Sequence, residues 1–159
     1  MTRHDDNKIL IGWQEWCSLP DLNVKYIKAK VDTGAKTSAL HAFNIKEKCI
    51  KKQKYVYFDV HPIQSNDEII ISTKAKVVDE RYVMSSNGSK EKRYVILTRL
   101  EMGDTSFDIE ITLTNRDSLR FRMLLGRDAL TKHFIIDPEK FSCLVKYKSC
   151  YIEKHYEEL

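Results

Sequence analysis

Short apolar runs alternate with polar residues along most of the chain, and the runs are rich in β-branched and aromatic side chains. Alternation with a period of two is typical of strands that bury one face. Turn-forming pairs such as Pro20-Asp21 and Asn87-Gly88 lie between the runs. The runs that we interpret as strands cover 9–13, 24–31, 55–60, 69–78, 94–100, 107–113 and 119–125. The pattern therefore predicts an all-β protein.

One short helix is predicted, over residues 127–132. It follows an apolar strand end and Gly126, places Leu130 toward the interior, and precedes a further strand at 134–137. Many short strands in a chain of 159 residues favour a closed or nearly closed barrel, because closure leaves no free sheet edges. We expect a single domain over 1–159, with 1–7 as a disordered tail.

Residues 79–94 are predicted to form a hairpin. Asn87-Gly88 is a strong two-residue turn signal, and polar residues surround it, so the tip is expected to be mobile. The hairpin is either a flap that covers a site or an ordinary surface feature.

Cysteine usage and the N-terminus suggest a cytoplasmic protein. The four cysteines lack C-x-x-C spacing, which favours reduced thiols over disulfides or a metal knuckle. The polar N-terminal residues precede an apolar stretch that is too short for a signal sequence or a membrane span. No membrane association is expected.

The net charge of +4 is mild, and acidic residues are mixed with basic ones, so direct nucleic-acid binding is not predicted. Lysine-rich clusters at 46–54 and 90–93 are interpreted as solvated faces. Arg120 and Arg122 differ, because they alternate with apolar residues. This alternation would place both arginines on one side of a strand that leads into Leu124-Leu125-Gly126.

The most informative candidate for chemistry is Asp32-Thr33-Gly34, at the end of the predicted strand 24–31. Asp supplies a titratable carboxylate, Thr a short hydroxyl, and Gly the freedom for a tight turn or for close approach of another backbone. Taken alone, the triplet is more often a plain turn than a catalytic site.

A second motif changes this balance. Asp32-Thr33-Gly34-Ala35, followed much later by Leu124-Leu125-Gly126-Arg127-Asp128, resembles the pattern of retropepsin-like aspartic proteases. Longer strings narrow the resemblance to a bacterial branch labelled ATP-dependent zinc protease, which is associated with the ligase that adds glutamates to a ribosomal small-subunit protein. These strings cover 11–16, 28–42, 78–81, 109–116 and 121–127. The resemblance implies a retropepsin-like barrel and an aspartic peptidase that trims glutamate tails.

Peptide hydrolysis by carboxylates needs two of them, which share a proton as aspartic proteases are known to do. Asp104-Thr105-Ser106 is the only near copy of the triplet, and it is interpreted as a hairpin turn because Ser replaces the glycine. A homodimer that brings two copies of Asp32 together is therefore predicted. By resemblance, Asp32 would be the acid and base, Thr33 would brace the two loops, Gly34 would permit their contact, and Ala35 continues the motif.

An acidic substrate would need fixed positive charge around Asp32, for which arginine forks are well suited. We expect this charge among six basic residues: Lys36, Arg81, Arg93, Arg116, Arg122 and Arg127. For Arg127, a structural ion pair is an equally weighted alternative.

No metal or cofactor is predicted. The chain has no H-E-x-x-H motif and no G-x-x-x-x-G-K-[ST] loop, although His41 and His61 could meet in space. No cysteine lies at an evident strand-to-helix turn, which disfavours Cys-His catalysis. Two other functions stay open. One is a non-catalytic barrel that binds acidic peptides, and the other, disfavoured, is a zinc metallopeptidase.

Overall fold

The computed structural model describes residues 7–84, 87–115 and 120–159, and within them six strands close into a β-barrel. The neighbours in order are β2, β3, β10, β4, β9 and β8, and a further pairing of β2 with β8 closes the ring. Their bounds are Gln14–Leu19, Val24–Val31, Met123–Leu125, Ser38–His41, Thr105–Thr114 and Lys90–Met102. The predicted retropepsin-like all-β barrel is confirmed.

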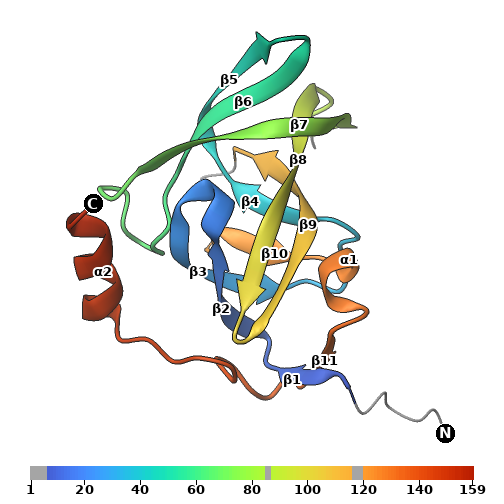
Figure 1. The fold of residues 1–159 in the computed structure, drawn as a ribbon. Helices are drawn as coiled ribbons and strands as arrows, with labels where there is room; N and C mark the ends of the chain where they lie inside the picture. Colours follow the sequence, from blue (N-terminus) through green and yellow to red (C-terminus); the bar gives the residue numbers. More distant parts are fainter. Residues whose placement is uncertain (1–6, 85–86, 116–119) are drawn as a thin grey trace, which may run out of the picture.

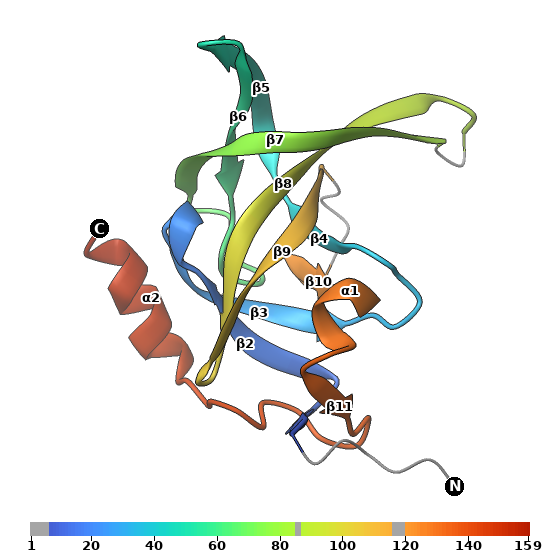
Figure 2. The ribbon, with the colours of Figure 1, turned by 45° about the vertical axis from the view of Figure 1, so that its right-hand side comes forward.

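Three more strands continue the sheet beyond the barrel: β7 (Ile71–Met84), β6 (Gln53–Val60) and β5 (Phe43–Ile50). They form an arm that projects from the barrel (Figures 1 and 2). β7 and β8 pair antiparallel out to Met84 and Lys90, so the hairpin predicted at 79–94 is confirmed. We call this element the flap-like hairpin; residues 85–86 at its tip lie outside the described residues.

The remaining elements flank the barrel. β1 (Ile9–Ile11) pairs in parallel with β11 (Phe134–Ile136), and the short turn η1 spans Pro20–Leu22. Helix α1 spans Arg127–Leu130, close to the predicted 127–132. The predicted tail at 1–7 lies outside the described residues apart from its last residue.

A second helix, α2 (Ser149–Glu157), was not predicted from the sequence. It docks through two buried side chains, Ile152 and Tyr156, which are four residues apart and share one helix face. The Tyr156 hydroxyl donates to the Tyr26 carbonyl at 2.6 Å and accepts from the Tyr26 N–H at 2.7 Å. Only two buried positions in a nine-residue helix give too weak a periodicity to identify such a helix from the sequence.

The predicted strand at 119–125 was partly wrong. Only Met123–Leu125 forms strand, and among the preceding described residues Arg120 is exposed whereas Arg122 is buried. The two arginines therefore do not share one exposed side. The sequence analysis also missed β2, β4 and β5. Most of β5 is exposed, which weakens the apolar alternation that marks a strand.

The barrel core positions the strand that carries Asp32. Ile27 and Ala29 of β3 are fully buried, whereas Lys30 points outward, so β3 alternates as expected until it ends at Val31. Within the described part of the chain, no helix has the length and apolar character needed to cross a bilayer.

Candidate active site

Asp32 lies where two parallel strands end side by side. β3 and β10 pair in parallel, with Val31 opposite Leu125. The Asp32 N–H donates to the Leu125 carbonyl at 2.9 Å, which extends this pairing by one residue into the turn. The two motifs that carry the family resemblance, the Asp-Thr-Gly turn and the Leu-Leu-Gly strand, therefore lie side by side in the structure.

The Asp32 carboxylate is oriented by its own turn. Its Oδ1 accepts a hydrogen bond from the Gly34 N–H at 3.0 Å, while the Asp32 carbonyl accepts from the Ala35 N–H at 3.2 Å. Among the described residues, Oδ2 has no hydrogen-bond donor. One carboxylate oxygen is thus fixed, and the other is available to a water molecule or to a second carboxylic acid.

The start of α1 holds the far side of the turn. The Arg127 N–H donates to the Ala35 carbonyl at 2.8 Å, and the Asp128 N–H donates to the Lys36 carbonyl at 3.0 Å. The Arg127 guanidinium reaches back to the Thr33 carbonyl, with Nη1 at 2.9 Å from the oxygen. Arg127 therefore contacts the Asp32-Thr33-Gly34 turn itself, which is the structural role weighed for it, although through a carbonyl rather than an ion pair.

Ser38 is a supporting residue that the sequence analysis did not single out. Its buried hydroxyl accepts a hydrogen bond from the Gly126 N–H at 3.0 Å. Gly126 is pressed against the turn so closely that a Cβ there would lie 2.7 Å from the Thr37 carbonyl carbon and 2.8 Å from the Lys36 oxygen. Only glycine lets α1 approach the turn at this distance.

We expect Gly126→Ala to lower the free energy of unfolding by roughly 2 to 3 kcal/mol, because the added methyl group meets backbone that can move only by displacing the turn. Chemical denaturation with fluorescence detection measures this change. The matched control is Gly34→Ala, whose Cβ would meet only Asp32 Oδ1, at 3.2 Å. Equal denaturation midpoints for Gly126→Ala and the parent protein would contradict a steric role for Gly126.

Three cations surround the turn, and their charges are balanced differently. Lys36 is exposed, and within the described residues neither Lys36 nor Arg127 is within ion-pairing distance of a carboxylate. Arg81, on the flap-like hairpin, donates from Nη1 to Thr37 Oγ1 at 3.0 Å. It also lies 3.2 Å from an Asp79 oxygen and 3.7 Å from a Glu110 oxygen, so part of its charge is neutralised.

The contact between Arg81 and Thr37 also places the flap-like hairpin beside the turn that carries Asp32. In Figure 2 the end of the hairpin extends on the side of the barrel where α1 and the β3–β4 connection lie. This is the arrangement that a cover over the site requires.

The other predicted substrate-binding residues are placed differently. Arg93 lies opposite Arg81 on β8, with 16% of its side chain exposed and Nη2 3.5 Å from Glu91. Arg122 is 7% exposed, and its Nη2 lies 2.6 Å from Asp67. It precedes β10, whereas Asp32 adjoins the other end of that strand. Arg116 lies outside the described residues.

Glu15 is a further supporting residue that the sequence analysis did not identify. Its carboxylate is fully buried and accepts backbone hydrogen bonds from Gly12, Cys143 and Leu144, at 2.8, 2.9 and 3.0 Å. Adjacent to Gly12, the Trp13 carbonyl accepts from the Val31 N–H at 2.9 Å. The Glu15 carboxylate therefore fixes the backbone that supports β3 immediately before Asp32. The signal in the sequence was alternation: Glu15 has the same spacing as Cys17 and Leu19, which are also buried in β2.

Metal and thiol chemistry find little support. The described residues contain no group of three or more His, Cys, Asp or Glu side chains placed to hold a metal ion. His41 and His61 do approach each other, with ring centroids 6.2 Å apart, but they belong to a stack with Phe43, which lies 4.3 Å from His61. Burial raises the pKa of the Cys17 thiol, which disfavours its nucleophilic thiolate form.

Comparisons with known proteins agree with this geometry. The family model described as retropepsin-like aspartic endopeptidase RimB matches residues 10–146. Proteins named probable alpha-L-glutamate ligase from Shewanella pealeana and Parasynechococcus marenigrum are 46% and 43% identical, over 95% and 96% of this chain. The chain spans only 33% of the length of each.

A solved structure also matches. The crystal structure of a Legionella pneumophila protein of unknown function is 32% identical, with a TM-score of 0.70. The match covers 85% of this chain and 97% of that one. Most of the fold is thus shared with a solved relative.

Proposed function

The chain belongs to the RimB-like family of retropepsin-like aspartic endopeptidases, and we propose that it hydrolyses peptide bonds with a pair of Asp32 carboxylates contributed by two subunits. The observation that supports this proposal most directly is the placement of Asp32, at the ends of β3 and β10 with one carboxylate oxygen fixed by Gly34. A retropepsin-like fold alone does not establish activity, so the chemistry has to follow from this turn.

The proposed reaction needs one carboxylate in each protonation state. The ionised Asp32 takes a proton from water, whose oxygen attacks the peptide carbonyl carbon. The protonated Asp32 of the second subunit gives its proton to the carbonyl oxygen, and a tetrahedral diol forms. Proton transfer to the peptide nitrogen then lets the carbon–nitrogen bond break. When two carboxyl groups lie a few ångströms apart, ionisation of one opposes ionisation of the other. The pair therefore retains one shared proton, as in other aspartic proteases.

We propose that the substrate carries glutamate residues at its end, as in a glutamylated ribosomal protein. Lys36 and Arg127 adjoin the catalytic turn without a carboxylate partner among the described residues, which favours an anionic peptide. The longer relatives that contain this domain are named glutamate ligases. We place any ligase activity in the two thirds of those proteins that this chain does not match, and we place this domain in the cytoplasm.

A peptide that ends in several glutamates is expected to be shortened by the protein, whereas the same peptide with glutamines is expected to react at least about tenfold more slowly, because one charged contact typically contributes about 1.5 kcal/mol or more. Mass spectrometry of the products measures both rates and the bond that is cut. Equal rates for the two peptides would contradict selection by charge while leaving peptidase activity intact.

The alternative is a barrel that binds acidic peptides without cleaving them, since the same two cations would serve that purpose. It predicts saturable binding of the glutamate-tailed peptide, with no product under any conditions. Cleavage that depends on Asp32 would exclude it.

A further inference from the structure

We propose that the outer face of the β5–β6–β7 arm binds single-stranded nucleic acid. The register of the three strands aligns residues into rows across this face. Lys46 lies opposite Tyr57, which lies opposite Lys74, and Lys48 lies opposite Tyr55, which lies opposite Lys76. Directly opposed residues in antiparallel strands share one face of the sheet. Each row therefore reads lysine, tyrosine, lysine, and we call these six residues the Lys-Tyr face.

On this side of the arm the four lysines accompany one carboxylate, that of Asp59, which interacts electrostatically with Lys46. All four lysines are exposed, and within the described part of the chain none of them lies within ion-pairing distance of a carboxylate. The opposite face of the arm behaves differently, because Lys54 there is paired with Glu47 and Glu80. Four exposed lysines in two adjacent rows give this face a local positive charge that a polyanion can meet.

The tyrosines supply what a charged face alone lacks. Tyr55 and Tyr57 are half-buried, with rings on the surface of the arm. The ammonium groups of Lys48 and Lys74 lie 5.7 and 6.0 Å from the centroid of the Tyr57 ring. The long side chains of these lysines can turn away from the Tyr57 ring toward phosphates, and a base can then stack on the exposed ring. The face combines a track for a backbone of phosphates with platforms for bases.

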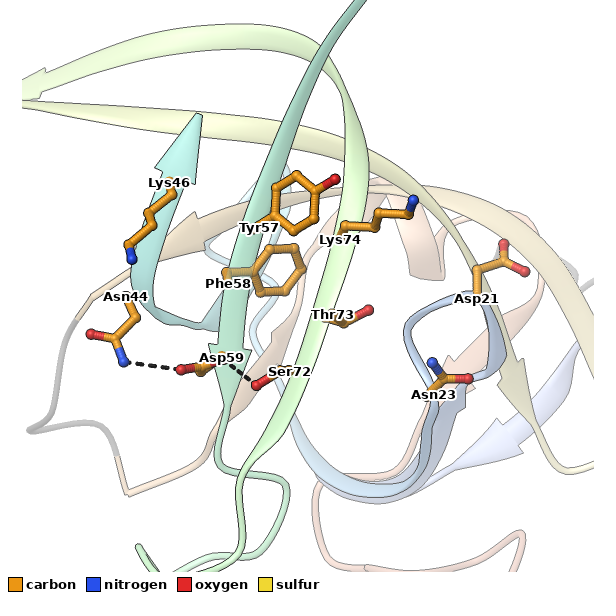
Figure 3. A pocket seen from close by; sticks show the side chains of 10 residues that line it. All are labelled: Asp21, Asn23, Asn44, Lys46, Tyr57, Phe58, Asp59, Ser72, Thr73 and Lys74. Carbon is orange, nitrogen blue, oxygen red and sulfur yellow. Dashed lines mark hydrogen bonds between the residues drawn. The ribbon is translucent and has the colours of Figure 1, made fainter. Parts of the chain in front are cut away.

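A pocket of 760 Å³ continues this face between the arm and η1. In Figure 3 the Tyr57 ring lies between Lys46 and Lys74, and the polar groups of Asn44, Asp59 and Ser72 gather below it. Asp59 accepts hydrogen bonds from Asn44 at 2.9 Å and from Ser72 at 2.6 Å, which hold its pKa below the usual value. An ionised carboxylate beside amide and hydroxyl groups offers donors and acceptors to the edge of an unstacked base.

Single-stranded nucleic acid fits these features better than other polyanions do. A glutamate tail would use the lysines but has no rings to stack on the tyrosines. In a duplex the bases are stacked on one another, so the tyrosines would again be unused. Anionic lipid surfaces likewise present charge without stacking partners. The lysine cluster that the sequence suggested to be a solvated face acquires this role only through the pairing register, which interleaves it with aromatic rings.

The test is fluorescence anisotropy of labelled single-stranded oligonucleotides of about 12 nucleotides, as RNA and as DNA, titrated with the full chain. We expect saturable binding whose logarithm of affinity falls with the logarithm of salt concentration, with a slope of about −3 for four phosphate contacts. A preference between RNA and DNA distinguishes the two sources of this ligand, and binding of either supports the proposal.

Two variants assign the binding to the Lys-Tyr face. Replacing Lys46, Lys48, Lys74 and Lys76 by glutamine is expected to weaken binding at least about tenfold. The matched control replaces the same number of exposed lysines elsewhere, Lys132, Lys146, Lys148 and Lys154, and is expected to change binding much less. Tyr57→Leu is expected to weaken binding of single strands about tenfold and to leave duplex binding unchanged. Thermal melting verifies that each variant is folded.

Several outcomes would overturn the proposal. Equal weakening by the two sets of lysine replacements would show unspecific attraction. An unchanged affinity in Tyr57→Leu, together with equally tight binding of poly-glutamate, would assign the face to acidic peptides. Binding of phosphatidylserine vesicles without binding of oligonucleotides would assign it to a membrane. The result is independent of the proposed peptidase, since Asp32→Asn should bind oligonucleotides normally and the lysine variant should cleave peptide normally.

Discussion

Replacing Asp32 by asparagine is expected to lower kcat/KM for a glutamate-tailed peptide by at least about a thousandfold, because it removes the group that exchanges protons with water and substrate. Asparagine has nearly the same shape, and its side-chain oxygen can still accept the hydrogen bond from the Gly34 N–H. The fold and the affinity for the peptide should therefore be retained. Progress curves followed by mass spectrometry measure the loss, and anisotropy of a labelled peptide measures the binding.

A mixing experiment tests whether the site needs two copies of Asp32. When equal amounts of wild-type and Asp32→Asn chains exchange subunits at random, about one quarter of the dimers are wild-type on both sides. If each dimer holds one shared pair, the specific activity per total amount of chain should fall to about a quarter of that of the wild-type protein alone. A fall of this specific activity to only one half would show that each Asp32 works alone.

Asp128→Asn is the matched control. Asp128 lies at the start of α1, which contacts the turn, but its contact there comes from its backbone N–H, which donates to the Lys36 carbonyl. The substitution should therefore leave cleavage within a few fold of wild-type. If Asp32→Asn cleaved the peptide at the wild-type rate, Asp32 would not be the catalyst. If the wild-type protein bound the peptide without cleaving it, the alternative of a peptide-binding barrel would be favoured.

The sequence allowed the central part of the site to be predicted because its parts are local. The alternation of β3 ends at Val31, and the turn chemistry of Asp32-Thr33-Gly34 follows directly. The link to Leu125 and Gly126 depended on resemblance, since the parallel pairing of β3 and β10 joins residues far apart in the chain. Family resemblance supplied the partner strand that periodicity cannot identify.

The contacts of the supporting residues could not be predicted, because their partners are set by tertiary structure. The Ser38 hydroxyl meets Gly126 across a long sequence separation, and Glu15 reaches Cys143 and Leu144 near the end of the chain. A serine in a strand or a glutamate between tryptophans looks ordinary in sequence. The same holds for Arg122, whose alternation suggested one side of a strand shared with Arg120, whereas it lies buried and paired with Asp67.

The arm shows the same limit for a surface. Lys46 and Lys48 belong to β5, which is mostly exposed and was not predicted as a strand. Without β5, the lysines could not be aligned with Tyr57 and Tyr55 of β6. The cluster then resembled a solvated run, and the combination of charge with aromatic rings was not visible. Register, rather than composition, gives this face its chemistry.

Glu15→Gln is expected to lower the free energy of unfolding by about 3 kcal/mol, although it only replaces one carboxylate oxygen by an amide NH₂ group. The fully buried carboxylate accepts from Gly12 and Cys143 through Oε2 and from Leu144 through Oε1. An amide group keeps the shape but replaces one oxygen by a donor. At least one backbone N–H then faces another donor, and hydrogen bonds to a charged acceptor are lost in a buried place.

Urea denaturation with detection by tryptophan fluorescence measures this change, since Trp13 and Trp16 flank the site of the substitution. The exposed Glu139→Gln is the matched control and should shift the midpoint little. A midpoint for Glu15→Gln equal to that of the control would mean that the 143–144 segment is held without this carboxylate. If instead the predicted loss is found, a destabilised 12–13 backbone should loosen Val31 as well, because its N–H donates to the Trp13 carbonyl. Faster hydrogen exchange at Val31 and Asp32 than in the control would then link this buried carboxylate to the catalytic turn.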